Sequence, residues 1–452
     1  MSSRESFVGT QKVLLWALLV LVCLSSLPIG SNRPLSWTIL AFFVIILFII
    51  QLIIDYMQSA PLQLKGLWLP STLFLLALSW GAVQMLPNLP EVLNHPVWQG
   101  LENATPAISA DPEQGQHAMM RLVTYAMIFW IAMRSAASSA RAEVMVGGFA
   151  IFSTGLAIFG IYALATGDNV FLGEGEQGPT LSASFINRNN YATYAVLGAL
   201  ANIAAYLQCF EATRINTQQM SSAVRDTLEQ FFAGAWIFAL GALICITAVA
   251  LTQSRAGNMS GLLGLIVFAA IWRGKGQKWN PFLLATLAAV VGFVAFTNAT
   301  GLANRFMADT TENGRFLAYP DIVTAIMDRP FLGHGLGAFE DVFRQYVKPE
   351  IAFAEWSQAH NSFLENAFEL GLPAAFAFYA ALLLVALRIR RGARIRKNNR
   401  SFTCFAFACI AAAVLHSCFD FSLQIPAVAA AFAMILGIGW AQSFSHKSSP
   451  GM

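Results

Sequence analysis

The sequence predicts an all-α integral membrane protein with about twelve transmembrane helices and a long, partly helical outer loop. Of its 452 residues, 57% are hydrophobic and only 11% are charged, and the mean hydropathy is +0.59, which excludes an ordinary soluble enzyme. Apolar runs of about 17 to 25 residues recur from end to end, and each could cross roughly 30 Å of hydrocarbon as a helix. No stretch is left over for a separate soluble domain.

Apolar windows predict the individual spans in chain order. The first could be mistaken for a cleaved signal peptide, but another long apolar run follows at once, so we favour a transmembrane helix. The six cysteines lack the short paired spacings of a zinc site and are expected to pack in the apolar spans. The predicted spans are residues 13–30, 35–55, 66–86, 119–135, 144–166, 190–209, 232–252, 257–273, 280–300, 362–387, 402–418 and 425–444.

Basic residues predict the direction of these spans. With the amino terminus inside, "WRGKGQK" and the stretch Arg388 to Arg400 both fall in inner loops, as the positive-inside rule requires. The largest outer loop is then 301–361, with helical periodicity near 321–327 and 339–347, and we expect short helices lying on the membrane surface. We divide the chain into residues 1–170, with five transmembrane helices, and residues 171–452, with this loop and helices ten to twelve.

Three arginines fall on the predicted outer side, where the charge bias predicts few. They are Arg188 in "FINRNNY", Arg255 in "TQSRAG" and Arg315 in "ENGRFLAY". A guanidinium stays charged and offers five fixed donors that suit phosphate oxygens. The three together therefore favour an anionic ligand such as a diphosphate, although each one alone could equally snorkel to lipid phosphates or cap a helix.

His360, in "QAHNSF", is predicted to stand at the start of the span 362–387, beside the long outer loop. An imidazole near its normal pKa can take a proton from a sugar hydroxyl, so a general base is the functional interpretation and a structural histidine is the alternative. Either Glu355 or Glu365 could orient it. His416 and Asp420, at the last outer turn, form either a helix-end pair or a support for the chemistry. Aromatic residues of the outer loop, Tyr319 among them, should mostly anchor it at the interface.

Several of these stretches together resemble the O-antigen ligase and O-antigen polymerase family of bacterial envelope proteins. "TQSRAG", "NGRFLAY", "DRPFLGHGLGAF" and "HNSFLENAFELG", which has a glycine ten residues after its Asn, look like elements of that family. "FINRNNYATY" and "HSCFDFSLQIP" do as well, so the resemblance covers roughly residues 180–440. Ala374 departs from the family pattern, which favours Gly, Thr or Tyr at that place.

The resemblance implies an inverting, metal-independent glycosyltransferase of the membrane-embedded, GT-C-like class that needs no cofactor. Its donor would be an undecaprenyl diphosphate-linked glycan on the periplasmic face of the bacterial inner membrane. Its partners would be that donor, a glycan or lipid A core acceptor, the bilayer and a chain-length regulator protein, with no nucleic acid. The residues implicated are His360 as the catalytic base, Arg188, Arg255 and Arg315 on the diphosphate, and Asn361, Glu365 and Asp420 as supporting residues.

The kind of acceptor stays open at this stage. A polymerase would extend another lipid-linked repeat unit of an O-antigen or exopolysaccharide, whereas a ligase would use the lipid A core, and we favour the polymerase. A transporter or flippase of the same lipid-linked sugar is the competing class. Transporters usually show internal repeats and polar residues at mid-membrane, whereas this chain places its charges at one interface.

Overall fold

The computed structural model describes residues 2–57, 66–102, 104–172, 178–216, 234–273, 310–352, 355–396 and 398–444. Over these ranges it contains fourteen α-helices and several short 3-10 turns. The α-helices are α1 (Ser2–Leu24), α2 (Pro34–Met57), α3 (Trp68–Gln84), α4 (Pro112–Ser135), α5 (Ser139–Thr166), α6 (Arg188–Asn216), α8 (Trp236–Leu251), α9 (Arg255–Arg273), α11 (Thr310–Asp328), α12 (Phe339–Phe343), α13 (Ser362–Leu370), α14 (Leu372–Ile395), α15 (Ser401–Ser417) and α16 (Pro426–Ala441).

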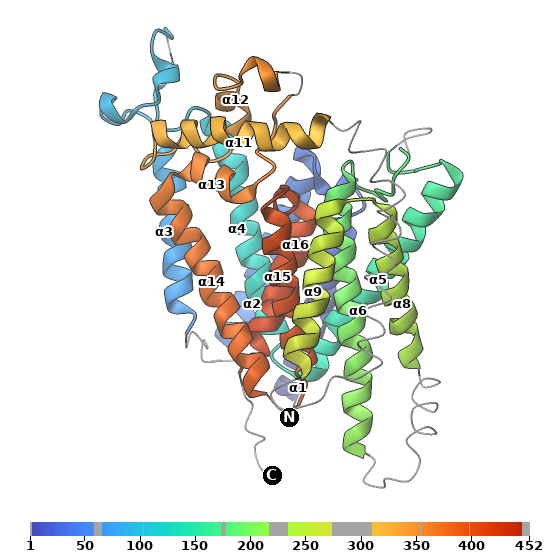
Figure 1. The fold of residues 1–452 in the computed structure, drawn as a ribbon. Coiled ribbons are helices and arrows are strands. Elements are labelled where there is room, and N and C mark those ends of the chain that lie inside the picture. Colours follow the sequence, from blue (N-terminus) through green and yellow to red (C-terminus); the bar gives the residue numbers. More distant parts are fainter. Residues whose placement is uncertain are drawn as a thin grey trace.

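The long helices stand side by side, and α11 lies across one end of them with α12 and α13 (Figure 1). We call this the α11 end. The basic stretch at the end of α14 lies at the opposite end of the bundle (Figure 1). Every predicted span within the described residues contains a helix, and the span predicted at 280–300 lies outside them.

Among the described helices, five are long and apolar enough to cross a membrane: α2, α5, the first part of α6, α9 and α14. The bundle also exposes large apolar side chains, as on α2, where Phe42 is 60% exposed, and on α14, where Phe376 is 76% exposed. Bare hydrophobic surface of this kind is unfavourable in water and suits contact with lipid tails. The structure therefore supports a multi-pass membrane protein.

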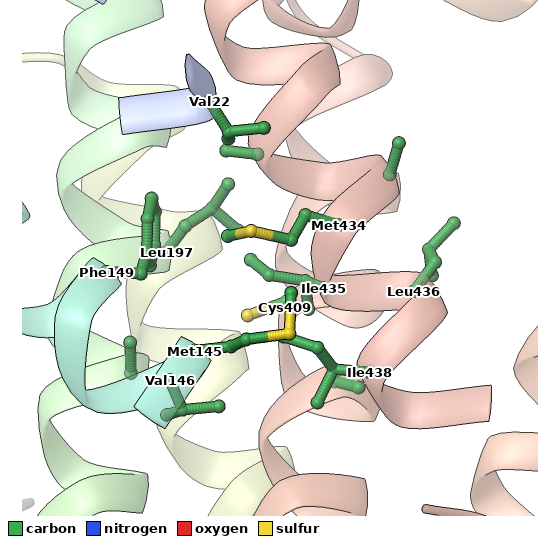
Figure 2. Packing of buried hydrophobic residues seen from close by; sticks show 14 of the residues in the cluster. Val22, Met145, Val146, Phe149, Leu197, Cys409, Met434, Ile435, Leu436 and Ile438 are labelled. Carbon is green, nitrogen blue, oxygen red and sulfur yellow. The ribbon is translucent and has the colours of Figure 1, made fainter. Parts of the chain in front are cut away.

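The largest apolar core among the described residues joins helices from both halves of the chain. It contains Phe149 of α5, Leu197 of α6 and Met434 of α16, whose side chains meet in Figure 2. Helix α16 packs along α4, and α1 packs along α5 and α16. Helix α16 thus packs against helices from the start of the chain as well as against its neighbour α15, so the bundle joins segments distant in sequence.

Glycines bring α9 very close to α6. A Cβ added to Gly257 would lie 2.5 Å from the Cβ of Ala192, and one added to Gly261 would lie 3.0 Å from Val196. Only small residues allow such an approach between helices. Because both contacts advance by four residues, the two helices run parallel, and Arg255 at the start of α9 lies level with Asn190 of α6.

The prediction of one helix over 362–387 is wrong, because the chain breaks at Gly371. This residue has φ 77°, and a Cβ on it would lie 2.6 Å from the carbonyl oxygen of Phe331. The break is fixed by hydrogen bonds from Leu372 N to Pro330 O at 2.7 Å and from the Trp80 indole to Leu370 O at 2.9 Å. The short helix α13 therefore stands apart from the membrane-length helix α14, and His360 precedes α13.

The outer-loop helices also differ from their prediction. Helix α11 runs from Thr310 to Asp328 and continues through Pro320, whereas α12 is only five residues long. A proline inside a helix removes one backbone hydrogen bond. Burial of Ala318, Ile322 and Ala325 in a cluster shared with α12 and α13 compensates for that loss, so tertiary packing extends the helix beyond its local pattern.

Candidate active site

Asp420 is the centre of a polar cluster at the α11 end. It lies in the turn between α15 and α16 and is fully buried. Its Oδ1 is 3.4 Å from Nδ1 of His360, its Oδ2 is 3.6 Å from a terminal nitrogen of Arg315, and Asn189 donates a side-chain hydrogen bond to Oδ2. The turn thus joins α6, α11 and the segment that leads into α13.

The carboxylate of Asp420 is held in its charged form. Burial alone raises its pKa, but the contact with His360 and the positive charge of His416, His360 and Arg315 outweigh it and lower the pKa from 3.8 to about 2. A carboxylate that stays ionised can stabilise an imidazolium that forms beside it. The cluster is therefore arranged for an imidazole that gains a proton.

The imidazole of His360 is held between aromatic rings with one nitrogen toward the carboxylate. Ring centroids lie 5.0 Å away in Phe421 and 6.4 Å away in Trp356. The Nδ1–Oδ1 distance of 3.4 Å is longer than a well-formed hydrogen bond, so the two groups face each other in a looser contact. Because Nδ1 faces Asp420, a proton on Nδ1 is favoured and Nε2 becomes the basic atom.

The backbone of His360 has an unusual conformation, with φ 49° in the left-handed region. The hydroxyl of Tyr319 donates to its carbonyl oxygen at 3.1 Å. The preceding N–H, of Ala359, donates to Oε2 of Glu365 at 2.8 Å. Two side chains from different helices therefore hold this strained residue.

Asn361 has a positional function. Its Oδ1 accepts hydrogen bonds from the N–H groups of Phe363 and Leu364, at 3.0 and 3.1 Å, and so caps α13. Its Nδ2 donates to the carbonyl oxygen of Cys418 at 3.1 Å. The two residues of the His-Asn pair thus have different functions. The asparagine fixes α13 to the Asp420 turn, and the histidine faces the Asp420 carboxylate.

Of the two acids that the sequence offers as partners of His360, Glu365 supports its backbone and Glu355 is exposed. The other oxygen of Glu365 accepts a hydrogen bond from Gln424 at 2.6 Å. Burial, and then the neighbouring Glu369, raise the pKa of Glu365. The acid that faces the imidazole is Asp420, which the sequence suggests only as a supporting residue.

Arg188 and Arg255 both begin helices at the α11 end. Arg188 is the first residue of α6 and directly precedes Asn189, the residue that bonds Asp420. Arg255 is the first residue of α9, whose start is capped by Ser254 Oγ, which accepts from Gly257 N at 3.0 Å. The parallel packing of α6 and α9 sets the two helix starts beside each other, so the structure brings all three predicted arginines to one end of the bundle.

His416 is a structural group in this arrangement. It is buried on α15, and its Nδ1 lies 3.2 Å from the hydroxyl of Ser422, which donates to Asn190 Oδ1 at 2.9 Å. The predicted pairing with Asp420 exists through the backbone, since Asp420 N donates to His416 O at 2.9 Å. His416 thus ties the Asp420 turn to α6.

Asn189 and Tyr319 are the residues that sequence reasoning missed. Asn189 stands next to Arg188 in the quoted motif, and that adjacency is the signal that could have found it. Tyr319 was predicted as an interface anchor, but its hydroxyl reaches the backbone of His360. It lies one helical turn after Arg315, and residues so spaced share a helix face.

Comparison with known proteins gives one family match that covers part of this site. Residues 240–379 match the family model described as O-antigen ligase, a range that contains Arg255, Arg315 and His360. Asn189 and Asp420 lie outside it. No curated protein matches the chain. Residues 240–379 are therefore an O-antigen ligase domain, of a family of membrane enzymes that act on lipid-linked glycans.

Proposed function

We propose that this protein is a glycosyltransferase that polymerises an undecaprenyl diphosphate-linked oligosaccharide on the periplasmic face of the bacterial inner membrane. The observation that carries the proposal is the contact between His360 Nδ1 and the buried Asp420 carboxylate. His360 lies within the range that matches the O-antigen ligase family, Asp420 lies beyond it, and the contact stands among arginines at the end of a membrane bundle. The proposed architecture is GT-C-like, with twelve spans.

The arginines have the donor diphosphate as their ligand in this proposal. Breaking the glycosidic bond leaves at least two negative charges on the leaving group, and fixed guanidinium groups stabilise that charge as it develops. Arg315 contacts Asp420 through one terminal nitrogen, and a guanidinium has further donors to offer. Arg188 and Arg255 would complete the site from the starts of α6 and α9.

His360 has the acceptor hydroxyl as its target. Its Nε2 removes the hydroxyl proton as the oxygen attacks the anomeric carbon from the face opposite the diphosphate, which inverts the configuration. The imidazolium that forms lies against the charged carboxylate of Asp420. Tight positioning of base and acceptor would supply much of the rate, as in other oriented reactions.

A ligase that transfers the glycan to a lipid A core is the second candidate. The description of the matching family favours it, whereas the cluster around Asp420 fits either acceptor. Purified protein given lipid-linked donor alone, or donor with lipid A core, separates the two, because only a polymerase forms longer lipid-linked chains without the core.

The experiment that tests the base is His360→Ala, with transfer rate and donor affinity measured on the same purified protein, with and without a chelator. We expect transfer to fall on the order of a hundredfold to ten-thousandfold, while the arginines keep donor affinity near its normal value. His117→Ala is the matched control, because His117 also lies at this end, on α4, outside the Asp420 cluster. Near-normal transfer by His360→Ala would remove the imidazole from the mechanism.

A further inference from the structure

Helix α11 carries two side chains that act on the same cluster. Arg315 reaches the carboxylate of Asp420, and Tyr319, one turn later, reaches the carbonyl oxygen of His360 at 3.1 Å. The same hydroxyl is 3.5 Å from the carbonyl oxygen of Cys418, in the turn that carries Asp420. The Tyr319 hydroxyl therefore lies between two backbone segments, the one that carries His360 and the one that carries Asp420.

We infer that Tyr319 is a positioning residue that sets the imidazole of His360 against Asp420. The inference deepens the proposed function and rests on it, because positioning matters only if His360 takes the proton.

The physical reason lies in the backbone of His360. A non-glycine residue at positive φ is strained and persists only where its surroundings fix it. Tyr319 fixes the carbonyl side, and Glu365 fixes the N–H of the residue before. Without the hydroxyl, the peptide plane after His360 loses its donor and can rotate, and the imidazole turns with it. A displacement of about 1 Å can cost a hundredfold in rate.

The ring of Tyr319 makes packing contacts that do not involve the hydroxyl. It meets Phe316 edge to face, with centroids 5.6 Å apart, and packs on the cluster that buries α11. Tyr319→Phe keeps the ring and removes only the hydrogen bond. The variant is therefore expected to fold, and its effect on transfer isolates the hydroxyl.

Tyr379 offers a matched control in the same region. Its hydroxyl donates to the carbonyl oxygen of Ser362, two residues after His360, at 2.7 Å. The same hydroxyl accepts a hydrogen bond from the Asn366 side chain. Tyr379→Phe also removes a hydroxyl that bonds a backbone carbonyl of the α13 segment. It leaves both bonds at His360 and Ala359 in place, so general loosening of α13 would lower transfer in this variant too.

The test compares Tyr319→Phe, Tyr379→Phe, His360→Ala and the double variant Tyr319→Phe/His360→Ala by steady-state transfer. For Tyr319→Phe we expect kcat to fall about tenfold to a hundredfold with the donor KM within twofold, because Arg315 keeps its own contact with Asp420. For Tyr379→Phe we expect kcat within about twofold of the unchanged protein. The double variant should be no slower than His360→Ala, since a residue that acts through His360 adds nothing once the imidazole is gone.

Four outcomes overturn the inference. Normal kcat in Tyr319→Phe, or equal losses in the two tyrosine variants, removes the positioning role and leaves the proposed function intact. A double variant much slower than His360→Ala shows that Tyr319 acts independently of the imidazole. Full transfer by His360→Ala refutes the proposed base and, with it, the positioning role.

Discussion

Oδ1 of Asp420 lies 3.4 Å from Nδ1 of His360, and each residue comes from a turn at the α11 end. The carboxylate is buried, whereas the imidazole keeps 21% of its side-chain surface exposed. The geometry resembles the oriented base of Ser-His-Asp hydrolases, in which a buried acid fixes the tautomer of a histidine whose other nitrogen faces the substrate.

Asp420→Asn should therefore lose transfer on the order of a hundredfold or more while keeping the shape of the turn. The amide carries no charge to stabilise the imidazolium, and it would meet the Asn189 amide as a second neutral group. Asp328→Asn is the control. Asp328 also lies at the α11 end and accepts a hydrogen bond from Tyr346 at 2.8 Å, but it is exposed. Equal rates in the two variants would argue against a role for the Asp420 charge.

Arg315→Lys and Arg255→Lys should restore little of the transfer lost in the corresponding alanine variants. An ammonium keeps the charge but cannot reach a carboxylate and a diphosphate with separate fixed nitrogens, as the guanidinium can. Arg344→Lys serves as the control, since Arg344 forms an exposed surface pair with Glu340 at 2.7 Å. Full activity with lysine at both positions would show that only net charge matters there.

Acid should loosen the contact between the two outer segments that His95 and His334 join. Nε2 of His95 lies 2.9 Å from Nδ1 of His334, and Nε2 of His334 donates to Ala325 O at 2.8 Å. Burial first, and then His334 and Arg329, lower the pKa of His95 to about 3. Burial first, and then Arg329, lower the pKa of His334 to about 4, against the opposing effects of its hydrogen bond to Ala325 and of Asp328. Both rings are thus neutral in the packed state.

The sign follows from those depressed values. Exposed histidines titrate near 6.5, so the open state binds protons first and the packed state loses stability as pH falls from about 6.5 toward 4. For each histidine, local opening should increase about tenfold per pH unit in that window. Hydrogen exchange of peptides from residues 86–102 and 329–338 measures it. The observed rate is divided by the intrinsic amide exchange rate, which itself falls with pH, to give the opening constant. His334→Gln should flatten the pH dependence of that constant and His117→Gln should not, and a pH-independent opening constant in the unchanged protein would contradict the prediction.

Gly371→Ala should destabilise the α11 end by at least about 1–3 kcal/mol, because the residue has φ 77° and a Cβ would meet the carbonyl oxygen of Phe331. Gly155→Ala is the control, since nothing lies within 4 Å of a Cβ there and α5 is helical at that point. Thermal unfolding of the detergent-solubilised proteins compares them. Equal midpoints would mean that the break at residue 371 tolerates a side chain.

The two ends of the bundle should lie on opposite sides of the membrane. Gln345→Cys, exposed after α12, should react with an impermeant thiol reagent in intact cells, and Asn398→Cys, exposed after α14, should react only after permeabilisation. The unchanged protein measures the background from native cysteines, of which Cys209 and Cys418 are partly exposed. Reaction of both variants in intact cells would refute the proposed topology.

The sequence predicts the helices well because each apolar run carries its own signal, and charge bias places Arg315 and His360 on one side. The residues that needed the structure depend on contacts between distant segments. The sequence suggests that Asp420 pairs with His416 at a helix end, whereas in the fold its turn lies against Arg315 of α11. The break at Gly371 was hidden because residues on both sides of it are apolar, and only the approach of Phe331 requires it.

The length of α13 has a consequence for how the cluster can change. The helix has nine residues, with Asn361 as its cap and Gly371 at its end, and the glycine is fixed against the segment around Phe331. Each residue of an α-helix advances about 1.5 Å and turns about 100°. One inserted or deleted residue would therefore turn His360 toward another side of the helix, so the length of α13 sets the direction in which the imidazole faces.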